Sequence, residues 1–385
     1  MILEKEKTAV PNMSVGADKE QPISKKPIEI VAEKFSFVND FDENSYEKIK
    51  RQQRIMSDPT YLETLSMNEL YENIYHSKPP IIDGLLYAGT YLFAGAPKVG
   101  KSFLMAQIAY HISTGIPLWN YPVSKGTVLY LALEDDYKRL QNRLFRMFGT
   151  DSTEKLRFST SSKYLNNGLE EQLQRFVNEN TDTKLIIIDT LQKIRESGND
   201  KFSYANDYEI ISKLKQFADR NHICLLLVHH TRKQQSDDKF EMISGTTGLL
   251  GSADGAFLLQ KEKRTSNNAT LDISGRDQQD QCLYLKRDTE RLIWELEKAE
   301  TELYVAPPNL IIEKVSAIVS VDTPNWSGTA TELVSVLGLD IAPNKLTSHL
   351  NVEADKLLND YNICYENSRN HAGRNIKLTL DISET

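Results

Sequence analysis

The sequence is poor in cysteine, has no long apolar run and has no excess of positive charge. Its three cysteines, Cys224, Cys282 and Cys364, lie far apart and form no Cys-x-x-Cys pair, so neither a disulfide framework nor a zinc site is expected. No stretch approaches the ~20 apolar residues of a membrane helix. The charged N-terminus MILEKEKTAV lacks the apolar core of a secretory signal. We therefore expect a cytoplasmic protein with no membrane partner.

The formal net charge of -8 speaks against nonspecific coating of nucleic acid by the whole surface, but the charge is unevenly spread. Residues 1–80 carry -3, residues 81–299 carry +1 and residues 300–385 carry -6, which together give -8. The nearly neutral segment 81–299 can still present a few basic loops to a single strand of nucleic acid. The length of 385 residues suggests two or three domains.

Composition and periodicity divide the chain into four parts. The first mixes Lys, Glu, Pro and Ser without a period and predicts a disordered lead, and the second predicts a helix from Ser45 to about Tyr75. A core and a small C-terminal domain follow, separated by Pro307-Pro308. The four parts span residues 1–40, 41–78, 79–300 and 308–385.

Short apolar runs alternate with helical stretches in the core. The expected strands are 91–94, 127–133, 184–188 and 224–228, and the expected helices are 102–113, 136–148, 169–178 and 207–220. This alternation predicts an α/β fold, a mostly parallel sheet with helices on both faces. Closely spaced strands at 256–260, 269–273, 282–285 and 292–294 should extend the same sheet as antiparallel strands.

The octapeptide GAPKVGKS fits the phosphate-loop pattern GxxxxGK[ST] in full. It lies between a predicted strand and an amphipathic helix, which is the context that the motif requires. Lys101 should reach the β- and γ-phosphates of ATP, and the Ser102 hydroxyl should bind Mg²⁺. The loop residues expected to bind nucleotide are Gly95, Ala96, Pro97, Lys98, Val99, Gly100, Lys101, Ser102 and Phe103.

Two carboxylates end predicted strands at the same edge of the sheet. Asp189 follows the apolar run LIII and is expected to bind nucleotide and hold Mg²⁺ with Ser102. The next residue is Thr190 and not a glutamate, so the residue that orients water must come from elsewhere. Glu134 is the candidate, because it ends the strand after the first helix. Asp135 and Asp136 are instead expected to begin the following helix.

These motifs, with the later LLLVHHTRK, together resemble the AAA_25-type, RepA-like hexameric helicases of plasmids and other mobile elements, which are DnaB-related RecA-type ATPases. The resemblance covers about residues 75–300 and implies a RecA-like P-loop NTPase core. It implies that Glu134 is the catalytic glutamate and that His230 senses the γ-phosphate. A histidine pair that merely ends a buried strand is the alternative for His229 and His230.

The resemblance further implies a ring, expected to be a hexamer, with ATP between subunits. The basic residue supplied by the neighbouring subunit is expected to be Arg276, which lies in a Gly-Arg-Asp sequence. Lys261, Lys263 and Arg264 are the alternative. The segment after His230 matches the family's DNA-contacting loop, with Arg232, Lys233 and Lys239 able to neutralise phosphates. A plain surface loop is the competing interpretation.

Residues 308–385 resemble a winged helix-turn-helix appended to such ATPases. The expected helices are Leu310–Ile318, Thr329–Leu337 and Asn344–Tyr361, the last acting as the recognition helix, and the expected wing strands are Ile363–Glu366 and Asn375–Leu380. Arg369, Arg374 and Lys377 give the wing a local positive charge. Binding to duplex DNA and docking of a protein both remain open.

The sequence therefore predicts a Mg²⁺-dependent ATPase that couples hydrolysis to movement along single-stranded DNA. Unwinding during replication of a mobile element is the activity that the resemblance favours. An ATP-switched DNA-binding regulator and a RadA-type recombination or repair ATPase are the alternatives.

Overall fold

The computed structural model describes residues 50–381, apart from short gaps at 52, 55–56, 78, 196–203, 233–237, 244–246, 277, 302–308 and 371–372. The chain divides into two compact units. One contains His76–Asn309, and the other combines the preceding segment to Tyr75 with Leu310–Thr385. The predicted lead 1–40 and the Pro307-Pro308 boundary lie outside the described residues.

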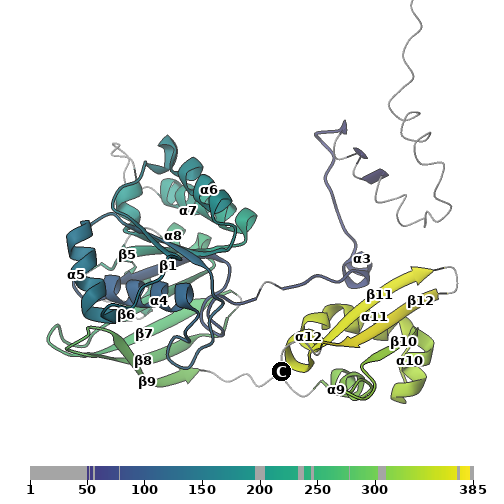
Figure 1. Ribbon diagram of the computed structural model, residues 1–385. Coiled ribbons are helices and arrows are strands. Elements are labelled where there is room, and N and C mark those ends of the chain that lie inside the picture. Colours follow the sequence, from purple (N-terminus) through teal and green to yellow (C-terminus); the bar gives the residue numbers. More distant parts are fainter. Residues whose placement is uncertain are drawn as a thin grey trace, which may run out of the picture. The chain divides into compact units, whose positions relative to one another are not determined.

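A large sheet, with nine strands among the described residues, forms the centre of the unit at 76–309 (Figure 1). Its order is β3-β2-β4-β5-β1-β6-β7-β8-β9, and the strands from β3 to β6 are all parallel. The parallel strands are β1 (Gly89–Gly95), β2 (Thr127–Ala132), β3 (Leu156–Ser159), β4 (Thr183–Asp189), β5 (Cys224–His230) and β6 (Gly255–Gln260). The four predicted parallel strands, β1, β2, β4 and β5, are confirmed, and β3 and β6 are additions to the parallel set.

Helices cover both faces of this sheet because its central strands are apolar on both sides. In β4, Leu185 and Ile187 join one hydrophobic cluster, whereas Ile186 and Ile188 join the other. The first cluster contains residues of α4 (Lys101–Thr114) and α5 (Tyr137–Phe148). The second contains residues of α6 (Leu169–Glu179), α7 (Tyr204–Asn221) and α8 (Thr247–Ser252). This arrangement confirms the predicted α/β fold, a mostly parallel sheet with helices on both faces.

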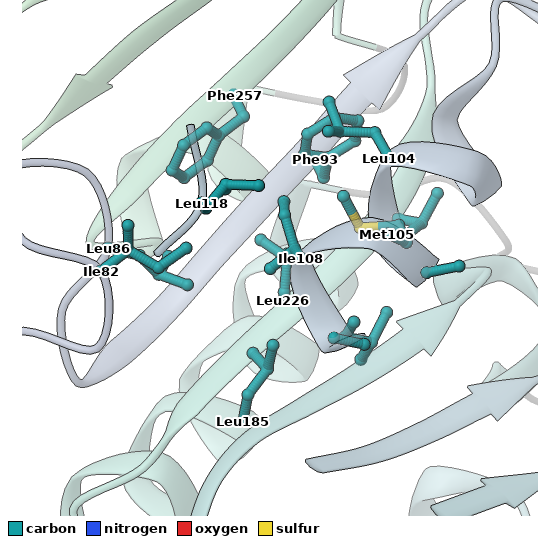
Figure 2. Packing of buried hydrophobic residues seen from close by; sticks show 14 of the residues in the cluster. Ile82, Leu86, Phe93, Leu104, Met105, Ile108, Leu118, Leu185, Leu226 and Phe257 are labelled. Carbon is teal, nitrogen blue, oxygen red and sulfur yellow. The ribbon is translucent and has the colours of Figure 1, made fainter. Parts of the chain in front are cut away.

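The helix α4 is fixed on the sheet by its apolar side chains. Figure 2 shows Leu104, Met105 and Ile108 packed over Phe93 of β1 and Leu226 of β5. The three helix side chains are at most 5% exposed. Burial of each contributes about 1.5–3 kcal/mol, so the position of the helix that follows the phosphate loop is strongly determined.

The antiparallel extension consists of β7 (Asn268–Gly275), β8 (Gln281–Arg287) and β9 (Trp294–Thr301). The predicted antiparallel strands at 269–273 and 282–285 are confirmed. The predicted strand at 256–260 is present, but the prediction that it is antiparallel is wrong: it follows a crossover through α8 and pairs parallel with β1, and the antiparallel pairing begins between β6 and β7. The predicted strand at 292–294 is wrong, because Leu292 has a positive φ of 63° and belongs to a turn. The strand begins at Trp294 and runs to Thr301.

The second unit contains α3 (Met67–Glu72), α9 (Leu310–Ser316), α10 (Ala330–Leu337), α11 (Pro343–Val352) and α12 (Ala354–Tyr361). Its three-stranded antiparallel sheet has the order β10-β12-β11, with β10 (Asn325–Thr329), β11 (Ile363–Asn370) and β12 (Gly373–Leu380). The apolar residues of α9–α12 and of the sheet form one separate hydrophobic cluster. The predicted helix at 329–337 and the two wing strands are present, and β10 was not predicted.

Two helix predictions for this unit are wrong. The predicted helix Asn344–Tyr361 is two helices, because Glu353 leaves the helical conformation with φ -98° and ψ 16°. The predicted helix from Ser45 to Tyr75 is not continuous, because the chain from Asp58 to Ser66 is not helical. Pro59 favours that break, since proline lacks the backbone N–H and restricts the residue before it.

The segment α3 is attached to the C-terminal part of its unit through Asn351, which is 1% exposed. The Asn351 side-chain amide donates to the Tyr71 carbonyl at 2.8 Å, and the Tyr365 hydroxyl donates to the Asn351 carbonyl oxygen at 2.9 Å. Arg374 forms an ion pair of 2.6 Å with Glu72. Residues far apart in the chain therefore form one unit.

No helix within the described part of the chain is long and apolar enough to cross a membrane.

Candidate active site

The phosphate loop joins β1 to α4, and its two consensus glycines are required by packing. A Cβ atom on Gly95 would lie 2.6 Å from the Leu259 carbonyl oxygen of the neighbouring strand. Gly100 has φ +110°, and its Cβ atom would lie 2.9 Å from Cζ2 of Trp294. Only glycine combines this backbone with so close an approach. Packing against the neighbouring strand and Trp294 therefore requires glycine at these two positions, independently of any bound phosphate.

Trp294 supports the loop from the start of β9. Its side chain is fully buried, and its backbone N–H and carbonyl both bond to the Gln107 side chain at 2.8 Å. The Trp119 indole N–H also donates to the Trp294 carbonyl, at 2.7 Å. Because Gln107 lies on α4, these bonds hold the antiparallel extension against the helix that begins at the phosphate loop.

Lys101 lies folded back over the loop. Its Nζ donates to the carbonyls of Gly95 at 2.7 Å and Ala96 at 3.1 Å, and the residue is 7% exposed. Burial lowers the pKa of Lys101 to about 8, against the opposing effect of the carboxylates of Asp189 and Glu134. A desolvated ammonium held beside carbonyl oxygens gains more favourable partners when phosphate oxygens arrive.

Ser102 and Asp189, the two residues predicted to hold Mg²⁺, lie in direct contact. The Ser102 hydroxyl donates to Oδ2 of Asp189 at 2.7 Å. The Tyr130 hydroxyl donates to the same oxygen at 2.8 Å. Burial raises the pKa of Asp189, and these two hydrogen bonds oppose that rise by stabilising the carboxylate.

The residues present fit a nucleoside triphosphate with Mg²⁺. The N-terminus of α4 has no side-chain cap, which leaves backbone N–H groups for phosphate oxygens. Within the described ranges, no group of three or more His, Cys, Asp or Glu residues could hold a metal by itself. Mg²⁺ characteristically uses one or two carboxylates with substrate phosphates. Ser102 and Asp189 would hold the ion, which would neutralise charge on the phosphoryl group.

Glu134 is brought to the same edge by the register of β2 and β4. Ala132 pairs with Asp189, and the Leu133 N–H donates to the Asp189 carbonyl at 2.8 Å. Glu134 therefore lies beside Thr190, whose hydroxyl donates to Oε1 of Glu134 at 3.1 Å. Glu134 is exposed and Thr190 is 2% exposed. Asp136 caps α5 through the Arg139 N–H, as its predicted role required.

His230 ends β5 opposite Gly95, on the β5 side of the phosphate loop. Its Nδ1 lies 3.4 Å from Nζ of Lys101. Burial and the Lys101 charge lower the pKa of His230, which favours a neutral imidazole that accepts from the ammonium. The structure thus brings Lys101, Ser102, Glu134, Asp189 and His230 together at one sheet edge.

Arg276 lies at the opposite edge of the sheet. It follows Gly275, which pairs with Gly255, and Gly255 pairs with Tyr91 at the amino end of β1. Tyr91 lies four residues before Gly95 in β1, a distance of about 13 Å along the strand. The Arg276 side chain is exposed and lies 4.0 Å from the Asp254 carboxylate. Arg276 therefore does not belong to the phosphate site of its own chain.

The remaining predicted loop residues lie around the N-terminus of α4. Val99 is buried, whereas Ala96, Pro97 and Lys98 are exposed. The guanidinium groups of Arg287 and Arg143 lie over the Phe103 ring, at 4.4 Å and 5.1 Å from its centroid.

Sequence reasoning missed Tyr130, Thr190, Trp294 and Arg287 as residues of this site. Tyr130 and Trp294 are distant in the sequence from the motif that they support, and no local pattern marks them. Thr190 carried a signal, because it directly follows the strand-end Asp189 where a glutamate is absent. Its register with Glu134 becomes visible only in the sheet.

The fold and the site define a RecA-like P-loop NTPase. Residues 57–236 match the model of the family AAA_25, described as an AAA domain. That match includes the phosphate loop, Glu134, Asp189 and His230. Residues 57–236 are thus similar to an AAA domain of this type, which confirms the AAA_25-type resemblance, and the chain is an ATPase. No curated protein matches the chain.

Three solved structures are partly similar to the chain. The first is described as an ATPase domain; it is 14% identical, with a TM-score of 0.48, and the match covers 68% of this chain and all of that one. The second is described as a DnaB-like replicative helicase and its interactions with primase. It is 18% identical, with a TM-score of 0.45, and the match covers 70% of this chain and 71% of that one. A KaiC-like protein from Pyrococcus horikoshii is 14% identical, with a TM-score of 0.42 and coverage of 59% and 99%.

The affinity for ATP should fall as the pH rises above about 8. The pKa of Lys101 is about 8 in the free protein, and phosphate binding requires the ammonium form. Above that pH the protein must take up a proton to bind, so the dissociation constant should rise about tenfold per pH unit until the pKa of the complex is reached. Titration with a fluorescent ATP analogue from about pH 7 to about pH 9.5 measures this slope.

Lys101→Ala should bind ATP weakly, with no such slope, and should not hydrolyse it. Lys155→Ala is the matched control, because Lys155 pairs with Asp182 at the other end of the strands. The control should retain both affinity and slope. The same slope in Lys101→Ala would show that another group titrates.

Tyr130→Phe should raise the Mg²⁺ concentration needed for half-maximal ATPase activity about tenfold, because the Asp189 carboxylate loses one of its two hydrogen-bond donors. ATPase rates measured against free Mg²⁺ give the half-saturating concentration. Tyr121→Phe, in the same hydrophobic cluster, is the control and should leave that concentration unchanged. An unchanged value in Tyr130→Phe would remove Tyr130 from the metal site.

Proposed function

We propose that the protein is a DNA-stimulated ATPase that acts as a ring and uses ATP hydrolysis to move along and unwind DNA. The observation that carries the proposal is the position of His230. Its imidazole contacts Lys101 over the phosphate loop, and the chain continues directly from it into a loop with basic residues. A change at the γ-phosphate can therefore reach that loop through one strand end.

The chemistry proposed for the site is phosphoryl transfer to water. Lys101 and the N-terminus of α4 bind the phosphates, and Ser102 and Asp189 hold Mg²⁺. The Glu134 carboxylate accepts a hydrogen bond from the attacking water and orients it. His230 lies where it can respond to the presence or loss of the γ-phosphate.

The loop after His230 is attached to the sheet at its base. Thr231 pairs with Ile243, and the Arg232 N–H donates to the Met242 carbonyl at 2.7 Å. Lys239 forms an ion pair of 2.7 Å with Asp272 of β7. This contact favours an anchoring role for Lys239, which leaves the exposed Arg232 as the described candidate for a DNA phosphate contact. Lys233 lies outside the described residues.

The position of Arg276 supports assembly. A P-loop ATPase commonly uses an arginine that stabilises the charge of the transferring phosphoryl group. Arg276 is exposed but lies at the end of the sheet opposite its own phosphate site, so this role for Arg276 would require the site of another subunit. The resemblance to RepA-like helicases adds the expectations of a hexamer, a cytoplasmic location and a role in replication of a mobile element.

An ATP-switched DNA-binding regulator is the second candidate, favoured by the separate C-terminal unit with its antiparallel sheet. Its local positive charge is partly neutralised, because Arg374 pairs with Glu72 and Lys377 pairs with Glu366 at 3.3 Å. The split of the predicted recognition helix at Glu353 further weakens the case for winged-helix binding to duplex DNA. Docking of a protein partner suits this unit better.

Glu134→Gln should bind ATP normally but lose turnover by about 100-fold or more, because the amide cannot serve as the base. The unchanged protein should hydrolyse ATP faster when single-stranded DNA is added and should separate the strands of a tailed duplex. ATPase and strand-separation assays on both proteins, with a fluorescent analogue to measure binding, test the proposal.

Asp136→Asn is the matched carboxylate control, because Asp136 caps α5 and should leave turnover nearly unchanged. ATP-dependent protection of one duplex site, without strand separation, would favour the regulator. Strand exchange on open filaments would favour a recombination ATPase. ATP hydrolysis indifferent to any DNA would contradict the proposal.

Arg276→Ala should lose turnover yet regain part of it when mixed with Glu134→Gln. In a mixed ring, some interfaces join an intact Glu134 site to an intact Arg276 from the neighbour. Random equal mixing restores about a quarter of the interfaces. ATPase activity of the mixture, compared with each variant alone, is the measurement. Absence of recovery, or the same behaviour from Arg264→Ala, would reassign the role.

A further inference from the structure

Thr190 lies where a threonine usually caps a helix, but its hydroxyl does not do so. It is the N-cap residue of the 3₁₀ turn Leu191–Ile194, and its side chain makes no capping hydrogen bond. Its Oγ1 instead donates to Oε1 of Glu134 at 3.1 Å. The hydroxyl is therefore used on a residue 56 positions away in the chain.

The donor of this hydrogen bond, Thr190, is held in place by burial, whereas the acceptor, Glu134, is exposed to solvent. Thr190 is 2% exposed, and its carbonyl accepts a hydrogen bond from the Lys193 N–H at 2.9 Å. The backbone that carries the Thr190 side chain is therefore held in place. Glu134 is exposed, and an exposed glutamate ordinarily samples several rotamers. In the described part of the chain, no second side chain donates a hydrogen bond to the Glu134 carboxylate.

The backbone brings the two residues together without fixing the carboxylate. The pairing of Ala132 with Asp189 and the bond from the Leu133 N–H to the Asp189 carbonyl determine where Glu134 begins. Three side-chain torsions still separate that backbone from the carboxylate. The Thr190 hydroxyl is the group that restricts them, because it is a directed donor at a fixed place.

We propose that Thr190 is a positioning residue that holds the Glu134 carboxylate in the orientation required to activate water. Thr190 occupies Oε1 from the buried side and leaves Oε2 to accept a hydrogen bond from the water. The inference rests on the proposed function, since it requires Glu134 to be the water-orienting group. It assigns a task to the residue that follows Asp189, where a glutamate is absent.

Thr190→Val should lower kcat for ATP hydrolysis roughly 10- to 100-fold, the effect expected for losing one hydrogen bond to a charged group. Valine keeps the branched shape, and no capping bond is lost, so folding should not suffer. The KM for ATP and the dissociation constant of a fluorescent ATP analogue should stay within about twofold. Thr190→Ser, which keeps the hydroxyl, should retain kcat within about threefold.

Thr90→Val is the matched control. Thr90 lies in β1 and is buried, like Thr190, and its hydroxyl has no hydrogen-bond partner among the described residues. This variant should leave kcat unchanged and should match Thr190→Val in melting temperature. Normal kcat in Thr190→Val, equal losses in Thr190→Val and Thr190→Ser, or a loss confined to nucleotide affinity would each overturn the proposal.

Combination with Glu134→Gln separates this inference from the proposed function. If Thr190 acts through Glu134, adding Thr190→Val to Glu134→Gln should lower the residual single-turnover rate by less than about twofold. A further loss of about tenfold would show that Thr190 acts elsewhere. Normal turnover in Glu134→Gln alone would refute the role of Glu134, whereas an inactive Glu134→Gln with an active Thr190→Val would refute only the role of Thr190.

Discussion

The parallel register of β2, β4, β5 and β1 is the constraint on which the site depends. These strands share an edge, so residues that end them meet even when they are distant in the chain. Lys101 and Ser102 follow β1, Glu134 follows β2, and Asp189 and His230 end β4 and β5. A slip of one residue in any pairing would turn a functional side chain toward the opposite face. Alternate side chains of these strands are close-packed in the two hydrophobic clusters, and this specific packing opposes the slip.

Much of this arrangement could be predicted from the sequence because its signals are local. The GAPKVGKS loop, the strand that ends in Asp189 and the alternation of apolar and helical stretches each lie within a short window. Parallel topology then requires the strand ends to converge. The Ser102–Asp189 bond and the proximity of Lys101 and His230 follow from that reasoning.

The features that escaped prediction depend on contacts that no window contains. In the sequence, Tyr130 is indistinguishable from any other buried strand residue, and only the fold brings its hydroxyl within hydrogen-bond distance of Asp189. The break at Glu353 falls within a continuous helical pattern, because packing in the C-terminal unit overrides the period there. Arg276 could be recognised from its neighbours in sequence, but its position at the far sheet edge follows only from the antiparallel pairing of β7.

The docking of α3 beside Asn351 has a topological consequence for how the chain connects the two units. The chain leaves that unit before His76, forms the whole ATPase unit, and returns at Leu310. The two units are therefore joined by two tethers instead of one. Cleavage of the chain at one of these two crossings would therefore leave the two units covalently joined through the other.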